Sequence, residues 1–171
     1  MTAFASIKPS ALSREAFVAA FADIYEHSPW VAESVFAQGI GPEDDVIEHL
    51  HGRMARALLN AGREAQLALI NAHPDLAGKA AMRGELTAAS SAEQAGAGIH
   101  ACSAEEFARF GELNAAYKAR FGFPFIMAVQ GRDRQQILDA FAQRLHNTPE
   151  QEFARALAEI NRIALLRLQA L

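Results

Sequence analysis

The chain of 171 residues contains one cysteine, Cys102, so no disulfide can form within it. No CxxC pair or group of cysteines has the spacing of a zinc site, and a reducing compartment suits this composition best. The first residues lack the basic start and the apolar stretch of a signal peptide, and no window is long and apolar enough to span a membrane. The sequence therefore predicts a cytoplasmic protein that does not enter a membrane.

Positive charge is also scarce, because 16 lysines and arginines face 20 aspartates and glutamates and leave a formal net charge of -4. Such a chain has no large basic field to attract nucleic acid or anionic lipid. The P-loop, the GxGxxG fingerprint and the G-x-S-x-G nucleophile turn are missing, so phosphate cofactors and α/β-hydrolase chemistry are not expected. No metal is predicted, because H-E-x-x-H or similar spacing is absent around His27, His49, His51, His100 and His146.

Strand patterns are nearly absent, and apolar residues recur instead at the spacing of helices. Ser13 precedes an apolar stripe with spacings of four and three, which predicts a first helix that ends only at Ser28-Pro29. Further helix starts are indicated at Ser103 and Thr148, where Glu or Gln three residues later completes a capping box. Apolar residues make up 51% of the chain, and no repeat or linker divides it. Residues 1–171 are therefore predicted to form a single all-α domain, an irregular bundle of about eight helices.

The run LALINAH ends in a histidine, His73, that is followed by Pro74. A residue before proline is pushed away from the helical region, so His73 should stand at the C-terminal end of its helix. Leu69 and Ile70 lie four and three residues earlier, which directs the ring to the apolar side. Two interpretations remain open at this point: a buried histidine that bonds a terminal carbonyl, or an acid or base at the edge of a pocket.

Ser90, Glu93 and Gln94 are spaced i, i+3 and i+4, so on a helix they share one face and offer a hydroxyl, a carboxylate and an amide. The alternative is a capping box, since Ser90 with Glu93 also fits the S-x-x-E pattern. A cap does not explain Gln94, nor the AGAG segment that follows and permits close approach of backbone.

The stretch RFGFPFIMAVQGR, residues 120–132, carries glycine and proline where an amphipathic helix would not tolerate them. We expect a stiff, apolar connection between helices. Such a segment can wall a pocket and present backbone groups to a ligand, or it can be a plain buried loop.

In the last helix, Arg167 falls on the same arc as Ile160 and Ala164, whereas Arg162 lies opposite, at 100° per residue. A guanidinium on a core-facing stripe must either extend to solvent or find an anion. Arg167 is therefore a candidate to bind an anion.

These stretches together, HPDLAGK, S-x-x-E-Q-x-G-A-G, F-G-F-P-F-I-x-x-V-x-G-R and a terminal L-R-L, resemble the 2-oxo-4-hydroxy-4-carboxy-5-ureidoimidazoline (OHCU) decarboxylase family. The resemblance spans nearly the whole chain, and the motifs occur in the family's order. It implies an all-α homodimer that decarboxylates a ureidoimidazoline to (S)-allantoin in urate breakdown, without a cofactor.

The resemblance also implies roles for individual residues. The catalytic positions fall on His73 and Glu93, and the arginine falls on Arg162 or Arg167, of which the helical angle favours Arg167. The positions that contact substrate fall on Pro74, Ser90 and Gln94 and on the loop residues Phe123, Pro124, Phe125 and Ile126.

Two other functions remain open. One is a non-catalytic helical binding module, in which His73 caps a helix and Glu93 belongs to a solvated face. The other is a cofactor-free lyase or hydrolase that acts on a different ureide. An enzyme requires His73, Glu93 and Arg167 to converge on one pocket, whereas a binding module does not.

Overall fold

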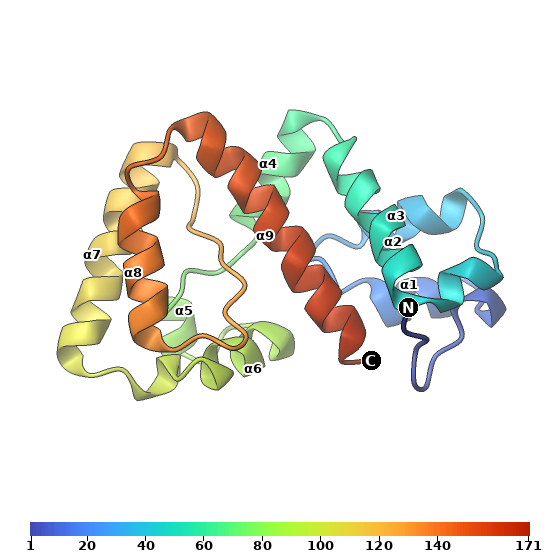
Figure 1. Cartoon of the computed structure of the whole chain (residues 1–171), viewed down its shortest axis with the longest axis horizontal. Coiled ribbons are helices and arrows are strands. Elements are labelled where there is room, and N and C mark those ends of the chain that lie inside the picture. Colours follow the sequence, from blue (N-terminus) through green and yellow to red (C-terminus); the bar gives the residue numbers. More distant parts are fainter. The chain divides into compact units, whose positions relative to one another are not determined.

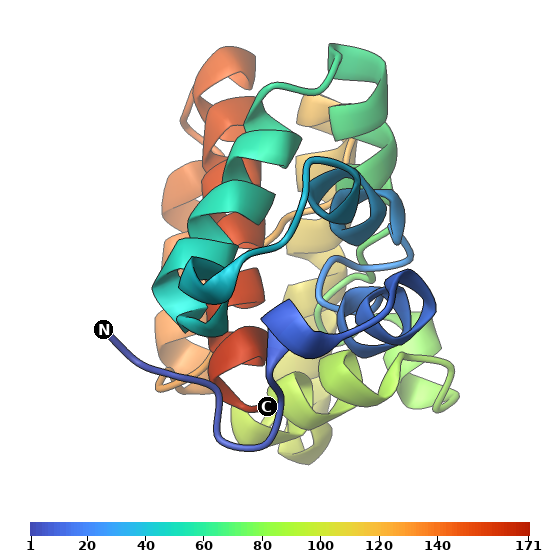
Figure 2. The ribbon, with the colours of Figure 1, turned by 90° about the vertical axis from the view of Figure 1, so that its right-hand side faces the viewer.

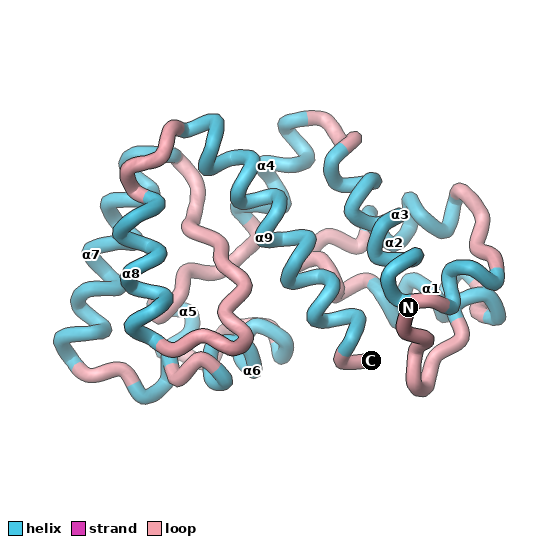
Figure 3. The backbone as a smooth tube through the Cα atoms, viewed as in Figure 1, coloured by secondary structure: helices cyan, strands magenta, loops and turns pink.

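The computed structural model describes the backbone of residues 1–171 and every side chain except that of Ala80. Along this described chain the regular elements are helices, and an isolated antiparallel bridge joins Ala3 to Val46 (Figure 1 and Figure 3). The turned view of Figure 2 shows the same succession of helices and loops. The all-α prediction is confirmed.

The α-helices of the described chain are α1 (Arg14–Phe21), α2 (Trp30–Ala37), α3 (Ile47–Leu59), α4 (Arg63–Asn71), α5 (Lys79–Met82), α6 (Ala88–Gly96), α7 (Ala104–Phe121), α8 (Arg134–Arg144) and α9 (Pro149–Gln169). Short 3-10 helices are η1 (Pro9–Ala11), η2 (Pro42–Asp45) and η3 (Ile99–Ala101). The sequence predicted about eight helices, and the short additional one is α5, a single turn of four residues.

The contacts within the chain divide it into two compact units. The first comprises Met1–Ala72 and Ile160–Leu171, and the second comprises His73–Glu159. Helix α9 contributes its N-terminal half to the second unit and its C-terminal half to the first. That residues 1–171 form one domain stays a prediction.

The first unit is built around amphipathic helices whose apolar faces are buried. Phe17 of α1 contacts the rings of Phe21 and Phe36, with centroid distances of 4.7 and 5.3 Å. Ser13 caps α1 as predicted, because its hydroxyl accepts a hydrogen bond from the backbone N–H of Ala16. Together these contacts fix the start of α1 against its neighbours.

The predicted end of the first helix was wrong, since α1 stops at Phe21 instead of reaching Ser28-Pro29. The chain turns there and buries Tyr25, whose hydroxyl donates to Oδ1 of Asn161 at 2.7 Å. His27 then adopts a left-handed conformation with φ of 48°. A hydrogen bond to a residue 136 positions away overrides the local helical pattern.

The second unit has an aromatic core in which Tyr117 of α7 contacts Phe125 and Phe141 at centroid distances of 5.4 and 5.8 Å. The predicted caps at Ser103 of α7 and Thr148 of α9 are confirmed, because each exchanges hydrogen bonds with the glutamate or glutamine three residues later. Both helices therefore begin where the local chemistry indicated.

Residues 123–129 connect α7 to α8 and are referred to below as the strap. They form neither helix nor strand, yet all seven residues are buried. Figure 3 shows the strap as an extended loop. Gly122, with φ of 78°, ends α7 in the left-handed conformation, and Pro124 then prevents the helix from resuming. The prediction of a stiff apolar connection is confirmed.

Candidate active site

His73 lies where the sequence predicted it, just past a helix end. Helix α4 ends at Asn71 with Ala72 as its C-cap, and His73 begins the turn that leads through Pro74. Both residues are half-buried. A half-buried side chain is shielded from water in part and still accessible, which suits an acid or base that meets a small substrate.

The turn that follows His73 is held by polar side chains of α6 and α7. The Gln94 amide accepts a hydrogen bond from the N–H of Ala77 at 3.2 Å and donates one to the carbonyl of Asp75 at 3.3 Å. Asn114 donates to the carbonyl of Leu76 at 2.9 Å. The Nζ atom of Lys118 lies 2.6 Å from Oδ2 of Asp75. The backbone of this turn is therefore fixed from two helices.

Sequence reasoning missed Asn114 and Lys118. Asn114 is buried on the face of α7 that also carries Phe110, Leu113 and Tyr117. A polar residue on a buried apolar stripe normally has a hydrogen-bonded partner, and this signal was available in the sequence. Lys118 gave no such signal, because it is exposed and one of many charged helix residues.

Ser90, Glu93 and Gln94 lie within α6, and the capping-box interpretation of Ser90 with Glu93 is wrong. Helix α6 begins at Ala88, and the cap is Thr87, whose hydroxyl accepts from the N–H of Ser90 at 3.3 Å. Ser90 and Gln94 are buried and Glu93 is half-buried. The three residues therefore lie within one helix, as their i, i+3, i+4 spacing predicted, and they remain candidates for the functional site.

The glycines of the AGAG segment, Gly96 at the end of α6 and Gly98 after it, were predicted to permit close approach of backbone, and at Gly98 the close contact is with a side chain. Its φ is 77°, and a Cβ there would lie 3.3 Å from Nη1 of Arg134, which donates to the Gly98 carbonyl at 2.9 Å. At Gly96 no described atom would lie within 4 Å of an added Cβ. In the second unit, the approaching group at Gly98 is thus the Arg134 side chain.

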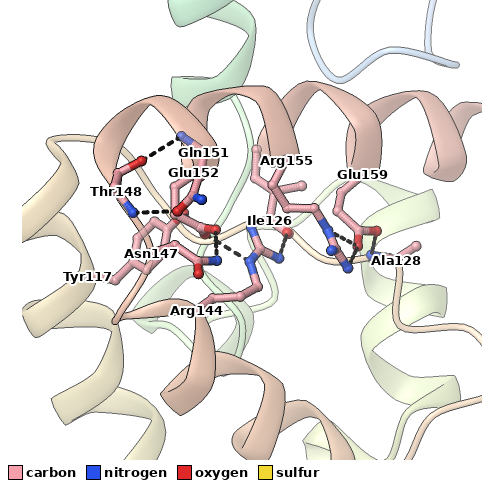
Figure 4. A network of polar contacts seen from close by, with 10 residues as sticks. All are labelled: Tyr117, Ile126, Ala128, Arg144, Asn147, Thr148, Gln151, Glu152, Arg155 and Glu159. Carbon is pink, nitrogen blue, oxygen red and sulfur yellow. Dashed lines mark hydrogen bonds and ion pairs between the residues drawn. The ribbon is translucent and has the colours of Figure 1, made fainter.

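The strap contains Phe123, Pro124, Phe125 and Ile126, the loop residues that were predicted to contact substrate. Side chains of α8 and α9 form hydrogen bonds with its backbone (Figure 4). Arg144 of α8 donates from Nη1 to the carbonyl of Ile126 at 2.7 Å. Glu159 of α9 accepts from the N–H of Ala128 at 3.1 Å. The sequence predicted neither partner, because each lies more than fifteen positions from the residue it bonds.

Arg167 is buried and Arg162 is exposed, so the prediction that Arg167 lies on the core-facing side of the last helix is confirmed. Its role in binding an anion of the substrate stays a prediction. In the first unit, Nη1 of Arg167 lies 2.9 Å from Oε2 of Glu26, which is itself only 2% exposed. The same nitrogen donates to the carbonyls of Asp23 at 3.2 Å and Ile24 at 3.4 Å. The guanidinium thus has a protein carboxylate as a partner. Convergence of Arg167 with His73 and Glu93, which belong to the second unit, stays a prediction.

Among the described side chains, no group of three or more histidine, cysteine, aspartate or glutamate residues is arranged to hold a metal ion. Within the same part of the chain, no helix is both long and apolar enough to cross a membrane.

The second unit also has an open groove of about 570 Å³ between α7 and the turn after His73. Its lining includes Phe107 and Asn114 of α7, Gly78 of the turn and Lys79 of α5, and none of the predicted site residues contributes to it. The groove is therefore no candidate for the predicted chemistry.

The fold and these residues define a helical protein in which a histidine-proline turn is fixed by buried amides and lies in the same unit as a polar helix face and a buried apolar loop. The chain belongs to the OHCU decarboxylase family, whose model matches residues 10–169.

Individual proteins agree with this assignment. The chain is 45% identical to the 2-oxo-4-hydroxy-4-carboxy-5-ureidoimidazoline decarboxylase of Haloferax volcanii over 157 residues, which cover 92% of this chain and 89% of the relative. It is 42% identical over 145 residues to the uric acid degradation bifunctional protein PucL of Bacillus subtilis, covering 85% of this chain and 28% of that protein. A crystal structure of (S)-allantoin synthase matches with a TM-score of 0.74 and 29% identity over 95% of this chain, which spans 52% of that one.

Proposed function

We propose that this protein decarboxylates 2-oxo-4-hydroxy-4-carboxy-5-ureidoimidazoline to (S)-allantoin in urate breakdown. Support comes from membership of the family and from relatives whose names state this activity, uric acid degradation or allantoin synthesis. The structural observation that carries the proposal is the pair of hydrogen bonds between Gln94 and the turn after His73, one accepted and one donated by the Gln94 amide. These bonds tie the histidine-proline turn to the helix that carries Ser90 and Glu93.

The reaction needs a group that handles one proton near neutral pH. The bond from C4 to the carboxylate breaks and carbon dioxide leaves. The electron pair forms a double bond between C4 and C5, the carbon that carries the ureido group, while the former C5–N double bond becomes a single bond and its nitrogen takes up a proton. A proton is then delivered to C5 as the C4 hydroxyl loses its proton and becomes the carbonyl of allantoin. Neutral imidazole, with an unperturbed pKa of about 6.5, suits this task. In our proposal His73 hydrogen-bonds the substrate near the departing carboxylate, and His73 or Glu93 supplies the proton.

The remaining residues would bind and orient the ring. Pro74 and Ser90 would contact one face of the substrate, together with the backbone of the strap from Phe123 to Ile126. Gln94 would serve both the substrate and the turn that it already bonds. Because the ring is held from one face, the proton arrives on one side only, which yields a single enantiomer.

Arg167 would pair with the substrate's carboxylate or a ring carbonyl. A guanidinium is a planar fork of N–H donors that suits a carboxylate or a carbonyl. The Glu26 carboxylate and the carbonyls of Asp23 and Ile24 fix one edge of the guanidinium and thereby limit its rotamers.

We also propose a cytoplasmic homodimer that uses neither metal nor cofactor and binds neither nucleic acid nor membrane. The homodimer and the absence of a cofactor follow from the family resemblance, and the location follows from composition.

A direct test is to supply the ureidoimidazoline by converting urate with the two preceding enzymes of the route, and to follow substrate loss together with carbon dioxide release. The proposal requires both to accelerate in a one-to-one ratio. Substrate loss without carbon dioxide would indicate a hydrolase, and binding without turnover would indicate a non-catalytic module.

A further inference from the structure

The strap poses a physical problem, because seven consecutive residues are buried without helix or strand to satisfy their peptide groups. Buried backbone groups need partners, and a loop that has them is held more rigidly than one that does not. The proposed function uses this backbone to bind substrate, and the inference below rests on that function. The side chains that hold the strap in place therefore bear on the reaction without touching the substrate.

Arg144 of α8 holds two successive strap residues. It is buried, and its Nη1 donates to the carbonyl of Ile126 at 2.7 Å while its Nε donates to Glu152 at 2.8 Å. Its guanidinium carbon lies 4.3 Å from the centre of the Phe125 ring. That ring stacks on Phe141 at 3.8 Å with an interplanar angle of 9°. One side chain thus restrains a carbonyl and the neighbouring ring.

Glu152 of α9 orients Arg144. The Glu152 side chain is fully buried and accepts three hydrogen bonds, from Arg144, from the hydroxyl of Tyr117 at 2.6 Å and from Nδ2 of Asn147 at 2.9 Å (Figure 4). Burial and the contact with this carboxylate raise the pKa of Tyr117, so the hydroxyl remains a donor. A buried carboxylate with three donors has little freedom to rotate, and the arginine that it bonds is fixed with it.

Glu159 of α9 holds the strap at a second point. Its Oε2 accepts from the N–H of Ala128 at 3.1 Å, and its Oε1 lies 2.9 Å from Nη2 of Arg155 one helical turn away. Glu159 is buried, whereas the Arg155 side chain is about half exposed. The carboxylate therefore uses one oxygen for the strap and the other for a partner on its own helix.

The two contacts act on one edge of the strap. In an extended chain, residues two apart direct their peptide groups to the same side, and the intervening residues direct theirs to the opposite side. The bonded groups belong to Ile126 and Ala128, which are two apart. The opposite edge then carries the peptide groups of Phe125 and Met127.

We propose that Arg144 and Glu159 are positioning residues, which hold one backbone edge of the strap so that the opposite edge receives the substrate ring. Glu152 and Tyr117 act through Arg144. Because this edge orients the ring, the two contacts also determine which face of the carbon receives the proton.

The clearest test uses Glu159, because removal of a partner from the fully buried Arg144–Glu152 pair can prevent folding. Glu159→Ala removes the bond to Ala128, Glu159→Gln retains an acceptor oxygen, and Arg155→Ala removes only the exposed partner. We expect Glu159→Ala to raise KM roughly tenfold, as loss of one charge-assisted hydrogen bond predicts. It should also lower the excess of (S)-allantoin. Glu159→Gln and Arg155→Ala should stay close to wild type in KM and in the excess of (S)-allantoin.

Hydrogen exchange at the Ala128 amide gives a readout that does not require activity, and Glu159→Ala should accelerate it while Glu159→Gln should not. A folded Glu159→Ala variant with unchanged exchange, KM and enantiomeric excess would overturn the proposal. If the wild-type protein does not turn over the ureidoimidazoline, the proposed function fails. In that case, unchanged exchange of the Ala128 amide in Glu159→Ala would still refute the role of the Glu159–Ala128 hydrogen bond in holding the strap. Faster exchange would show that this hydrogen bond holds the strap but has only a structural role.

Discussion

At the scale of single residues, His73 is positioned by groups that bond the turn after it. Gln94 and Asn114 together occupy two carbonyls and one N–H between Asp75 and Ala77. None of these three hydrogen bonds involves the imidazole, so they should persist when that ring is replaced. Replacement of His73 is therefore a test of the proposed catalytic role.

His73→Asn should remain folded and lose at least about a hundredfold in kcat, the usual contribution of a positioned acid or base. Asparagine retains a hydrogen-bonding side chain but cannot exchange a proton near neutral pH. The measurement is kcat together with the thermal midpoint. The control is Gln38→Ala, which changes an exposed residue of the first unit. A near-normal rate in the asparagine variant would remove His73 from the mechanism.

Arg167→Lys should impair both stability and substrate binding. Lysine retains the charge but lacks the planar guanidinium, whose Nη1 contacts Glu26 and the carbonyls of Asp23 and Ile24. We expect a loss of about 1–3 kcal/mol in unfolding free energy, because buried partners are left without their donors.

Arg162→Lys is the matched control for this substitution, since Arg162 lies on the same helix and is exposed. It should change neither KM nor the thermal midpoint. A sensitive Arg162 beside an indifferent Arg167 would show that the anion-binding arginine had been assigned to the wrong position.

At the scale of elements, local chemistry predicted where several helices begin. Ser13, Ser103 and Thr148 cap their helices because each hydroxyl accepts a hydrogen bond from the N–H three residues later. At Ser103 and Thr148 the side chain three positions later also bonds the N–H of the cap residue. Gly122 and Pro124 also predicted a break, since neither residue favours continuation of a helix. All of these signals are local, because the groups that interact lie within four residues of one another.

The features that were not predicted depend on partners far along the chain. Helix α1 ends early because Tyr25 bonds Asn161. The strap is bonded by Arg144 and Glu159, neither of which is marked by a motif. A polar residue on an apolar stripe indicates that a partner exists, but it does not identify that partner.

The junction of η2 and α3 depends on Asp44, which should make the first unit sensitive to acid. Burial alone would raise the pKa of Asp44, but hydrogen bonds from the Gly41 N–H, Arg53 and His49 outweigh it and lower the pKa. A carboxyl whose folded pKa lies below its unfolded value stabilises the protein above the unfolded pKa, and this contribution is lost as pH falls through the folded pKa.

Asp44→Asn should therefore destabilise the protein at neutral pH and differ progressively less from wild type as the pH falls below about 4. The measurement is urea unfolding at a series of pH values, with the exposed Asp139→Asn as the control. A constant difference between Asp44→Asn and wild type across that series would contradict this role of the carboxylate.

At the scale of the whole molecule, helix α9 serves both compact units. Its buried polar residues are Glu152 and Glu159 in the second unit and Asn161 and Arg167 in the first. Each interrupts an otherwise apolar face, and each bonds a loop or side chain distant in sequence. One helix therefore provides the strap contact at one end and the candidate anion-binding arginine at the other.

Stereospecific formation of (S)-allantoin is the most direct measure of the proposed activity. The substrate is generated from urate by the two preceding enzymes in chelator-treated buffer, and the circular dichroism of allantoin is followed with and without this protein. We predict that the protein accelerates the appearance of the (S) enantiomer, and that chelation does not reduce the rate. An enantiomer ratio and rate equal to those of the protein-free control would contradict the assignment.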